Sequence, residues 1–137
     1  QLRLIMKRAV IVEDFKLIAD IWHATLIEEG FEFVEVVRNS DEVETVIEKV
    51  NPSIILMDIN LPGKLNGLEL TDILLKKNPS LKILILTIHT EPTYINRAIE
   101  AGAKGYVTKN SSLTELKCAI KEILNGNTYL CEEVRSN

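Results

Sequence analysis

The sequence predicts a doubly wound α/β fold, in which a five-stranded parallel sheet in (βα)5 order carries helices on both faces. Strand-like and helix-like patterns alternate five times along the chain. Most strand-like runs are continuously apolar, which is typical of parallel strands that are covered on both faces. With 137 residues, the chain has the length of one domain and can bury a core without disulfide or metal staples.

Five short runs are expected to form the strands, and each is bounded by turn or polar residues. The run 31–37 alternates between apolar and polar residues, so one of its faces is expected to be half-exposed. The other four are nearly uniformly apolar. The expected strands cover 9–12, 31–37, 53–57, 82–86 and 105–108.

Helices are expected between the strands, wherever apolar residues recur at helical spacing. Ser40 is expected to cap the second helix, and Ser112 with Glu115 forms a predicted capping box before the last one. Gly30, Gly102 and two Asn-Pro pairs provide stop signals. The helical stripes cover 15–29, 43–50, 68–77, 94–99 and 113–124.

Composition excludes several classes of protein. Sixteen Lys and Arg against twenty Asp and Glu give a net charge of −4, which argues against a nucleic-acid-binding surface. No apolar run reaches the length of a membrane span, and no secretory signal is visible. Cys118 and Cys131 form neither a disulfide framework nor a zinc site, and Cys131 is expected to be an exposed tail thiol. A reducing cytoplasm is therefore the expected location.

The two ends are expected to lie outside the domain, which we place at 6–130. Residues 1–5 are interpreted as a remnant that precedes the natural start at Met6. Residues 131–137 are interpreted as the start of a linker to a further domain.

Polar side chains follow four of the predicted strands. Glu13-Asp14, Asp58, Thr87 and Lys109 each stand where an apolar run ends. Because the carboxyl ends of parallel strands share one edge of the sheet, these groups are expected to meet in one cleft.

Clustered carboxylates repel one another, and a hard divalent cation such as Mg²⁺ relieves that repulsion. A lysine and a hydroxyl can bind the remaining oxygens of a phosphoryl group, and an ionised aspartate is a competent nucleophile. The set therefore predicts Mg²⁺-dependent phosphoryl transfer to a carboxylate.

Five segments in order, on the predicted strand ends, resemble the receiver domain of two-component response regulators. The resemblance spans about Arg8 to Leu130, and the stretch 98–130 resembles the NarL/FixJ (LuxR-type) subfamily. The segments are VIVED (10–14), ILMDINLPG (55–63), NGLEL (66–70), ILILT (83–87) and EAGAKGYVTK (100–109).

The resemblance implies a flavodoxin-like fold and a role for each site residue. Asp58 corresponds to the phosphoacceptor, which receives its phosphoryl group from a sensor histidine kinase. The implied metal ligands of Mg²⁺ are Glu13, Asp14, Asp58 and the backbone carbonyl of Asn60.

The resemblance also implies a switch and an output. Thr87 corresponds to the switch hydroxyl, Lys109 to the phosphate-binding lysine, and Tyr106 to the aromatic that turns inward when Thr87 moves. The phosphoryl group would favour the arrangement in which Thr87 and Lys109 bind it. Such receivers assist their own phosphotransfer and autodephosphorylation but are not enzymes with external turnover. A homodimer, and a DNA-binding helix-turn-helix domain that this chain lacks, are the other partners implied.

Three features depart from the family pattern. Lys64 or Leu65 is a one-residue insertion in the loop after the third strand. Ile88 stands where the family has a small residue, so slower phosphorylation by small donors and slower hydrolysis are expected. Asn110 follows Lys109 where many receivers have proline, which leaves the isomer of that peptide bond open.

Alternatives remain at this point. Tyr106 could be a plain core residue, and His89 is interpreted as a loop residue without a role. A receiver-like module that does not use phosphate would be expected to lack one of the acids or the lysine. A Mg²⁺-dependent phosphatase would usually carry a second acid at position 60, where this chain has Asn60.

Overall fold

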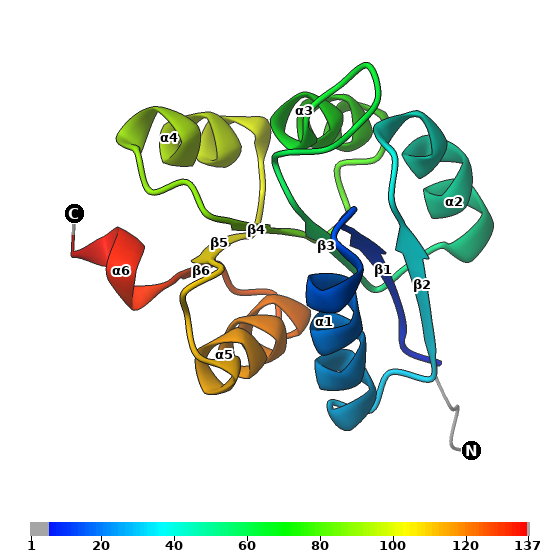
Figure 1. The fold of residues 1–137 in the computed structure, drawn as a ribbon, viewed down its shortest axis with the longest axis horizontal. Coiled ribbons are helices and arrows are strands. Elements are labelled where there is room, and N and C mark those ends of the chain that lie inside the picture. Colours follow the sequence, from blue (N-terminus) through cyan, green and yellow to red (C-terminus); the bar gives the residue numbers. More distant parts are fainter. Residues whose placement is uncertain (1–5, 137) are drawn as a thin grey trace.

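The computed structural model describes residues 6–136, which form one parallel sheet with helices on both faces (Figure 1). The strands are β1 (Arg8–Val12), β2 (Phe33–Val37), β3 (Ile54–Met57), β4 (Ile83–Thr87), β5 (Gly105–Thr108) and β6 (Tyr129–Leu130). The helices are α1 (Lys16–Glu28), the short 3-10 helix η1 (Ser40–Glu42), α2 (Val43–Val50), α3 (Gly67–Lys77), α4 (Pro92–Ala101), α5 (Leu113–Leu124) and α6 (Glu132–Arg135).

The sheet has the doubly wound order that the sequence predicts. Its strands lie in the order β2-β1-β3-β4-β5-β6, and all neighbouring pairs are parallel. α1 and α5 cover one face, whereas α2, α3 and α4 cover the other (Figure 1). The strand order reverses between β1 and β3, so a ligand crevice is expected where these two strands end.

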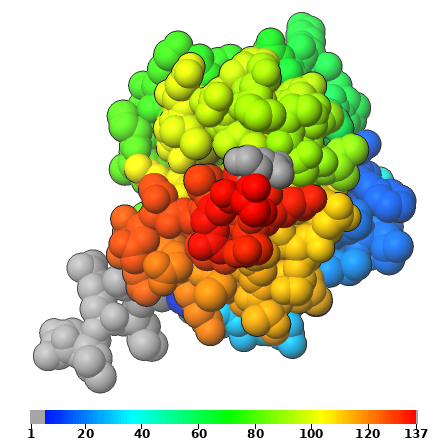
Figure 2. All heavy atoms as spheres, turned by 90° about the vertical axis from the view of Figure 1, so that its left-hand side faces the viewer, coloured from blue at the N-terminus to red at the C-terminus, as the bar shows by residue number. Residues whose placement is uncertain are grey.

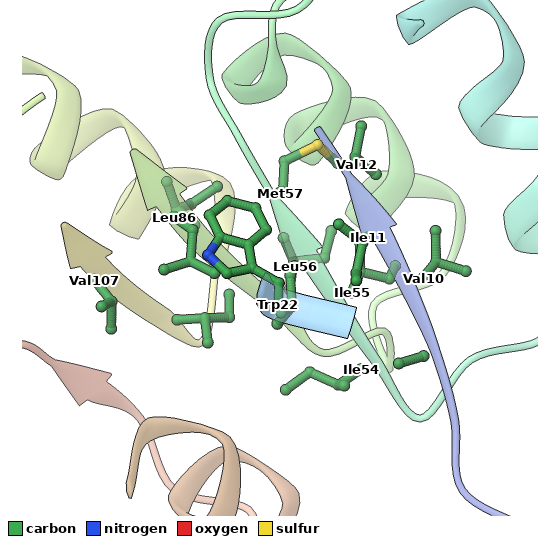
Figure 3. Close-up of a cluster of buried hydrophobic side chains, with 14 of the residues drawn as sticks. Val10, Ile11, Val12, Trp22, Ile54, Ile55, Leu56, Met57, Leu86 and Val107 are labelled. Carbon is green, nitrogen blue, oxygen red and sulfur yellow. The ribbon is translucent and has the colours of Figure 1, made fainter. Parts of the chain in front are cut away.

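The central strands owe their position to uniformly apolar sequence. All four side chains of β3 and the last four of β1 have no exposed surface. Trp22, from α1, is 5% exposed and lies over these strands (Figure 3). Burying a large apolar side chain contributes about 1.5–3 kcal/mol as an upper estimate, so β1 and β3 anchor the edge that carries the site.

The prediction of five strands is wrong by one. Tyr129 and Leu130 form a sixth, very short strand that pairs with Gly105 and Tyr106 of β5. This segment satisfies backbone groups along the outer edge of β5, since the Tyr129 amide donates to the Lys104 carbonyl and the Cys131 amide donates to the Tyr106 carbonyl. A strand of two residues has no measurable period, which is why the sequence pattern does not reveal it.

The segment that follows β6 packs on the domain. Cys131 is fully buried, so the expectation of an exposed tail thiol is wrong, and Val134 of α6 is 6% exposed. Figure 2 shows the red C-terminal segment between α4 above and α5 below. The expected domain boundary at residue 130 precedes Cys131 and Val134, and residues 1–5 and 137 lie outside the described residues.

Two predicted helix caps form differently. Ser112 does accept from the Glu115 amide at 3.1 Å, but the Glu115 carboxylate accepts from the Tyr129 hydroxyl and the Glu132 amide instead of returning to Ser112. Asn39, not Ser40, caps the helical turn before α2. A full capping box forms at α3, between Asn66 and Glu69.

In residues 6–136, no helix combines the length and apolar character that crossing a membrane requires.

Candidate functional site

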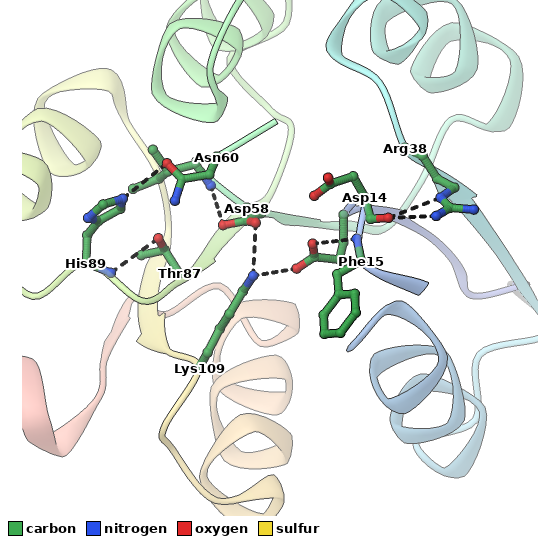
Figure 4. Close-up of polar contacts among 10 residues, drawn as sticks. Asp14, Phe15, Arg38, Asp58, Asn60, Thr87, His89 and Lys109 are labelled. Carbon is green, nitrogen blue, oxygen red and sulfur yellow. Dashed lines mark hydrogen bonds and ion pairs between the residues drawn. The ribbon is translucent and has the colours of Figure 1, made fainter. Parts of the chain in front are cut away.

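The polar residues predicted at the strand ends do meet at one edge of the sheet (Figure 4). Their backbones are held by the ladders of the sheet: the Asp58 amide donates to the Val12 carbonyl at 3.0 Å, and the Lys109 amide donates to the Thr87 carbonyl at 2.8 Å. The positions of these residues thus follow directly from strand register.

Three carboxylates form an acidic cluster at the ends of β1 and β3. Glu13, Asp14 and Asp58 each offer an oxygen within 4.8 Å of the other two. Glu13 is 1% and Asp58 3% exposed, whereas Asp14 is exposed. The three carboxylates line a pocket, here called the hollow, and Asn60 lines it too. Oxygen donors with excess negative charge suit a hard cation that keeps several waters, so these residues fit Mg²⁺.

Lys109 is the cation of the cluster. Its Nζ lies 2.6 Å from Glu13 Oε1 and 2.9 Å from Asp58 Oδ2, and Figure 4 shows Lys109 pointing toward Asp58. The other Asp58 oxygen accepts from the Ile59 amide at 2.7 Å. Together, these contacts fix the Asp58 carboxylate in one orientation.

The pKa values of Glu13 and Lys109 are both raised, but for different reasons. Burial raises the pKa of Glu13, and this effect outweighs the hydrogen bond from Lys109. Burial lowers the pKa of Lys109, but its hydrogen bonds to Glu13 and Asp58 outweigh that effect and raise it. Lys109 therefore stays charged, while Glu13 carries an unfavourable buried charge that a divalent cation would relieve.

Thr87 and Tyr106 are both buried and connect to the same loop. The Thr87 hydroxyl accepts from the His89 amide at 3.4 Å, and the Tyr106 hydroxyl donates to the His89 carbonyl at 2.7 Å. Tyr106 is 1% exposed, and burial raises its pKa well above the usual range. The ring thus points inward here, with its only polar atom satisfied by the loop after β4.

His89 takes part in this arrangement more than the sequence indicates. Its ring stacks on Tyr94 of α4, with centroids 4.2 Å apart, and its Nε2 lies 3.2 Å from Asn60 Oδ1. The residue therefore links the loop after β3 with the start of α4. Its place two residues after Thr87 was the only signal in the sequence.

The three departures from the family pattern lie around this site. Ile88 is 64% exposed and lines the same hollow as Asp58 and Lys109. Lys64 and Leu65 belong to the loop between β3 and α3, where their amides are held by side chains after β2. Within residues 6–136 every peptide bond is trans, including the bond between Lys109 and Asn110.

Comparison with known proteins agrees with this geometry. Residues 9–121 match the response regulator receiver domain family. The chain is 34% identical over 129 residues to the transcriptional regulatory protein DegU of Brevibacillus brevis, covering 93% of this chain and 54% of that protein. It is 37% identical over 108 residues to DesR of Bacillus subtilis, covering 79% of this chain and 53% of that protein.

A solved structure extends the likeness to the fold. A LuxR-family two-component response regulator from Aurantimonas sp. SI85-9A1 superposes with a TM-score of 0.85 at 30% identity, covering 96% of this chain and 94% of that one. The chain therefore belongs to the response regulator receiver domain family, and its relatives are regulators of the LuxR type. It spans about half the length of the curated relatives described above.

Proposed function

We propose that this chain is a phosphorylation-controlled switch of a two-component system and that Asp58 is its phosphoacceptor. The observation that carries the proposal is the placement of Asp58, a buried carboxylate held by Lys109 and the Ile59 amide beside Glu13 and Asp14. Receiver domains of this family are signalling modules.

The proposed transfer begins at a phosphohistidine of a sensor kinase. An Asp58 oxygen would attack phosphorus, so that a P–O bond forms while the P–N bond breaks and the imidazole nitrogen keeps the bonding electron pair. Lys109 supports this step because its ammonium already lies 2.9 Å from the carboxylate and can bind a phosphoryl oxygen. Thr87, at the end of the neighbouring strand, supplies a hydroxyl for another oxygen.

We further propose that Mg²⁺ is the cofactor, held by Asp14, Asp58, the Asn60 carbonyl and, through water, Glu13. When bound, Mg²⁺ neutralises charge on the phosphoryl oxygens. The support is the oxygen donor set and its excess of negative charge, with three carboxylates around one ammonium.

The switch would act through the loop after β4. If Thr87 moves onto the phosphoryl group, its contact with the His89 amide is lost, and the loop that holds the Tyr106 hydroxyl shifts with it. Phosphorylation then favours one of two arrangements of this loop and α4.

The output is proposed to lie outside this chain. Since its relatives are named transcriptional regulators and are about twice as long, we propose a DNA-binding domain in the full protein, a homodimer as a further state, and a cytoplasmic location.

The test is intact mass after incubation with Mg²⁺ and acetyl phosphate. Wild type should gain one phosphoryl group, and Asp58→Asn should gain none. Asp72→Asn, which changes an exposed carboxylate on α3, is the matched control and should gain the group like wild type. A gain that persists in Asp58→Asn would contradict the assignment.

A further inference from the structure

The residues directly after β2 contact two parts of the chain that flank the acidic cluster: Asp14, and the loop between β3 and α3. We define Arg38, Asn39, Ser40 and Asp41 as the 38–41 segment. On one side, the Arg38 guanidinium donates twice to the Asp14 carbonyl oxygen, from Nη2 at 2.8 Å and from Nε at 3.2 Å (Figure 4). A guanidinium fork fixes its acceptor in both distance and direction, so Arg38 restrains the backbone at a proposed metal ligand.

On the other side, the same segment holds the loop between β3 and α3. The Ser40 amide donates to the Pro62 carbonyl at 2.9 Å, and the Ser40 hydroxyl accepts from the Leu65 amide at 3.2 Å. The Asp41 carboxylate accepts from the Lys64 amide at 3.1 Å. The loop that carries the extra residue, and that follows Asp58 and Asn60, is therefore tied down by three hydrogen bonds.

Gly63 shows how closely the two parts fit. Its φ is +112°, and a Cβ at this position would lie 2.2 Å from Ser40 Oγ and 2.7 Å from Asn39 Oδ1. Only glycine permits both this backbone conformation and this approach. Ser40 itself is 3% exposed, so the contact is shielded from water.

From these contacts we infer that the 38–41 segment positions the divalent-cation site, with Arg38 as the residue that fixes Asp14 relative to the loop after Asp58. The inference rests on the proposed function only in taking the cluster to bind Mg²⁺. Arg38 is a positioning residue, because it reaches the cation through the backbone of Asp14 and through the segment it begins.

Because Arg38 is charged, the inference can be tested by the direction in which its loss shifts the dissociation constant of Mg²⁺. A cation this close to the cluster opposes the binding of Mg²⁺, so loss of the charge alone would tighten binding. Loss of a positioning contact would loosen the ligands and weaken binding. The two roles of Arg38 therefore predict opposite shifts in the dissociation constant.

The experiment is a Mg²⁺ titration followed by the fluorescence of Trp22, the single tryptophan, with calorimetry as a second measure. Trp22 is a suitable reporter because Lys109 Nζ lies 5.6 Å from its ring centroid. The variants are Arg38→Ala and Arg38→Lys. Arg97→Ala, an exposed arginine on α4, is the matched control.

We expect Arg38→Ala to raise the dissociation constant about tenfold, the lower end for loss of a group that holds a metal ligand, because the contact is exposed. Arg38→Lys should lie between Ala and wild type, and Arg97→Ala should equal wild type. Tighter or unchanged binding by Arg38→Ala would overturn the inference. Absence of Mg²⁺ binding by wild type would instead refute the proposed metal site, so the two failures are distinguishable.

A second pair of variants tests the contact between the 38–41 segment and the loop that follows β3. Gly63→Ala and Gly126→Ala both replace a glycine of positive φ, but only Gly63 has a neighbour within 4 Å. We expect Gly63→Ala to weaken Mg²⁺ binding severalfold and Gly126→Ala to leave it unchanged. Equal Mg²⁺ affinities in these two folded variants would count against a positioning role of the segment.

Discussion

Substitution of Gly67 by alanine is predicted to displace the proposed phosphoacceptor. Gly67 is the first residue of α3, and its amide donates to the Ile59 carbonyl at 2.8 Å. A Cβ here would lie 1.9 Å from the Asp58 carbonyl oxygen and 2.9 Å from Ile59 Cα. These neighbours are backbone atoms, so no side-chain rotation can relieve the contact.

The size of the effect follows from that geometry. To reach even a tight contact, α3 and the backbone of Asp58 must separate by about 1 Å, and overpacking of this kind costs about 1–3 kcal/mol. The better helix propensity of alanine offsets less than about 1 kcal/mol. A net loss of about 2 kcal/mol lowers the melting temperature by roughly 8 °C in a domain of this size.

The chemical step should suffer more than the fold. A misplacement of about 1 Å can slow a reaction about a hundredfold. The assay is the rate of phosphorylation by acetyl phosphate, measured by intact mass beside thermal melting. Gly126→Ala is the control, because its φ of +92° brings strain but no atom lies within 4 Å of the added Cβ. The reasoning is refuted if Gly67→Ala melts and reacts like wild type.

Three further predictions concern Ile88, the binding of Mg²⁺ and the C-terminal segment. Ile88 lines the same hollow as Asp58, so Ile88→Ala should accelerate both phosphorylation by acetyl phosphate and dephosphorylation; unchanged rates would contradict this expectation. The melting temperature should not change, since Ile88 is 64% exposed. Mg²⁺ at about a hundred times its dissociation constant should stabilise wild type by about 2.7 kcal/mol in thermal melts, and much less in Asp58→Asn. Tyr129→Phe should cost about 1 kcal/mol at neutral pH through loss of the hydrogen bond to Glu115. Burial and that bond raise the pKa of Tyr129 to about 12, so its stabilising effect is lost as the pH rises through that value; an absorbance titration should show this ionisation in wild type and not in Tyr129→Phe.

The part of the site that sequence could predict is the part that strand ends define. Glu13, Asp58, Thr87 and Lys109 each stand where a strand-like run ends, and parallel pairing brings such residues to one edge. Their meeting in the structure therefore depends on few assumptions. The same alternation of strands and helices predicted a parallel, doubly wound sheet, which the structure has.

The parts that sequence could not predict depend on tertiary contacts without a local pattern. β6 has two residues, and Glu115 leaves its expected partner Ser112 because the Tyr129 hydroxyl and the Glu132 amide compete for the same carboxylate. Arg38 donates to the backbone carbonyl of Asp14. Every residue has a backbone carbonyl, so the sequence does not indicate which one Arg38 contacts. The contact between Arg38 and Asp14 forms only once β1 and β2 are paired.

The central claim is that Asp58 carries the phosphoryl group, and chemical trapping tests it most directly. Borohydride reduces an acyl phosphate to an alcohol, so phosphorylated aspartate becomes homoserine, which peptide sequencing by mass spectrometry can locate. After reaction with acetyl phosphate and Mg²⁺, we predict homoserine at position 58 and unchanged aspartate at positions 14 and 72. Homoserine at another position, with Asp58 unmodified, would contradict the account.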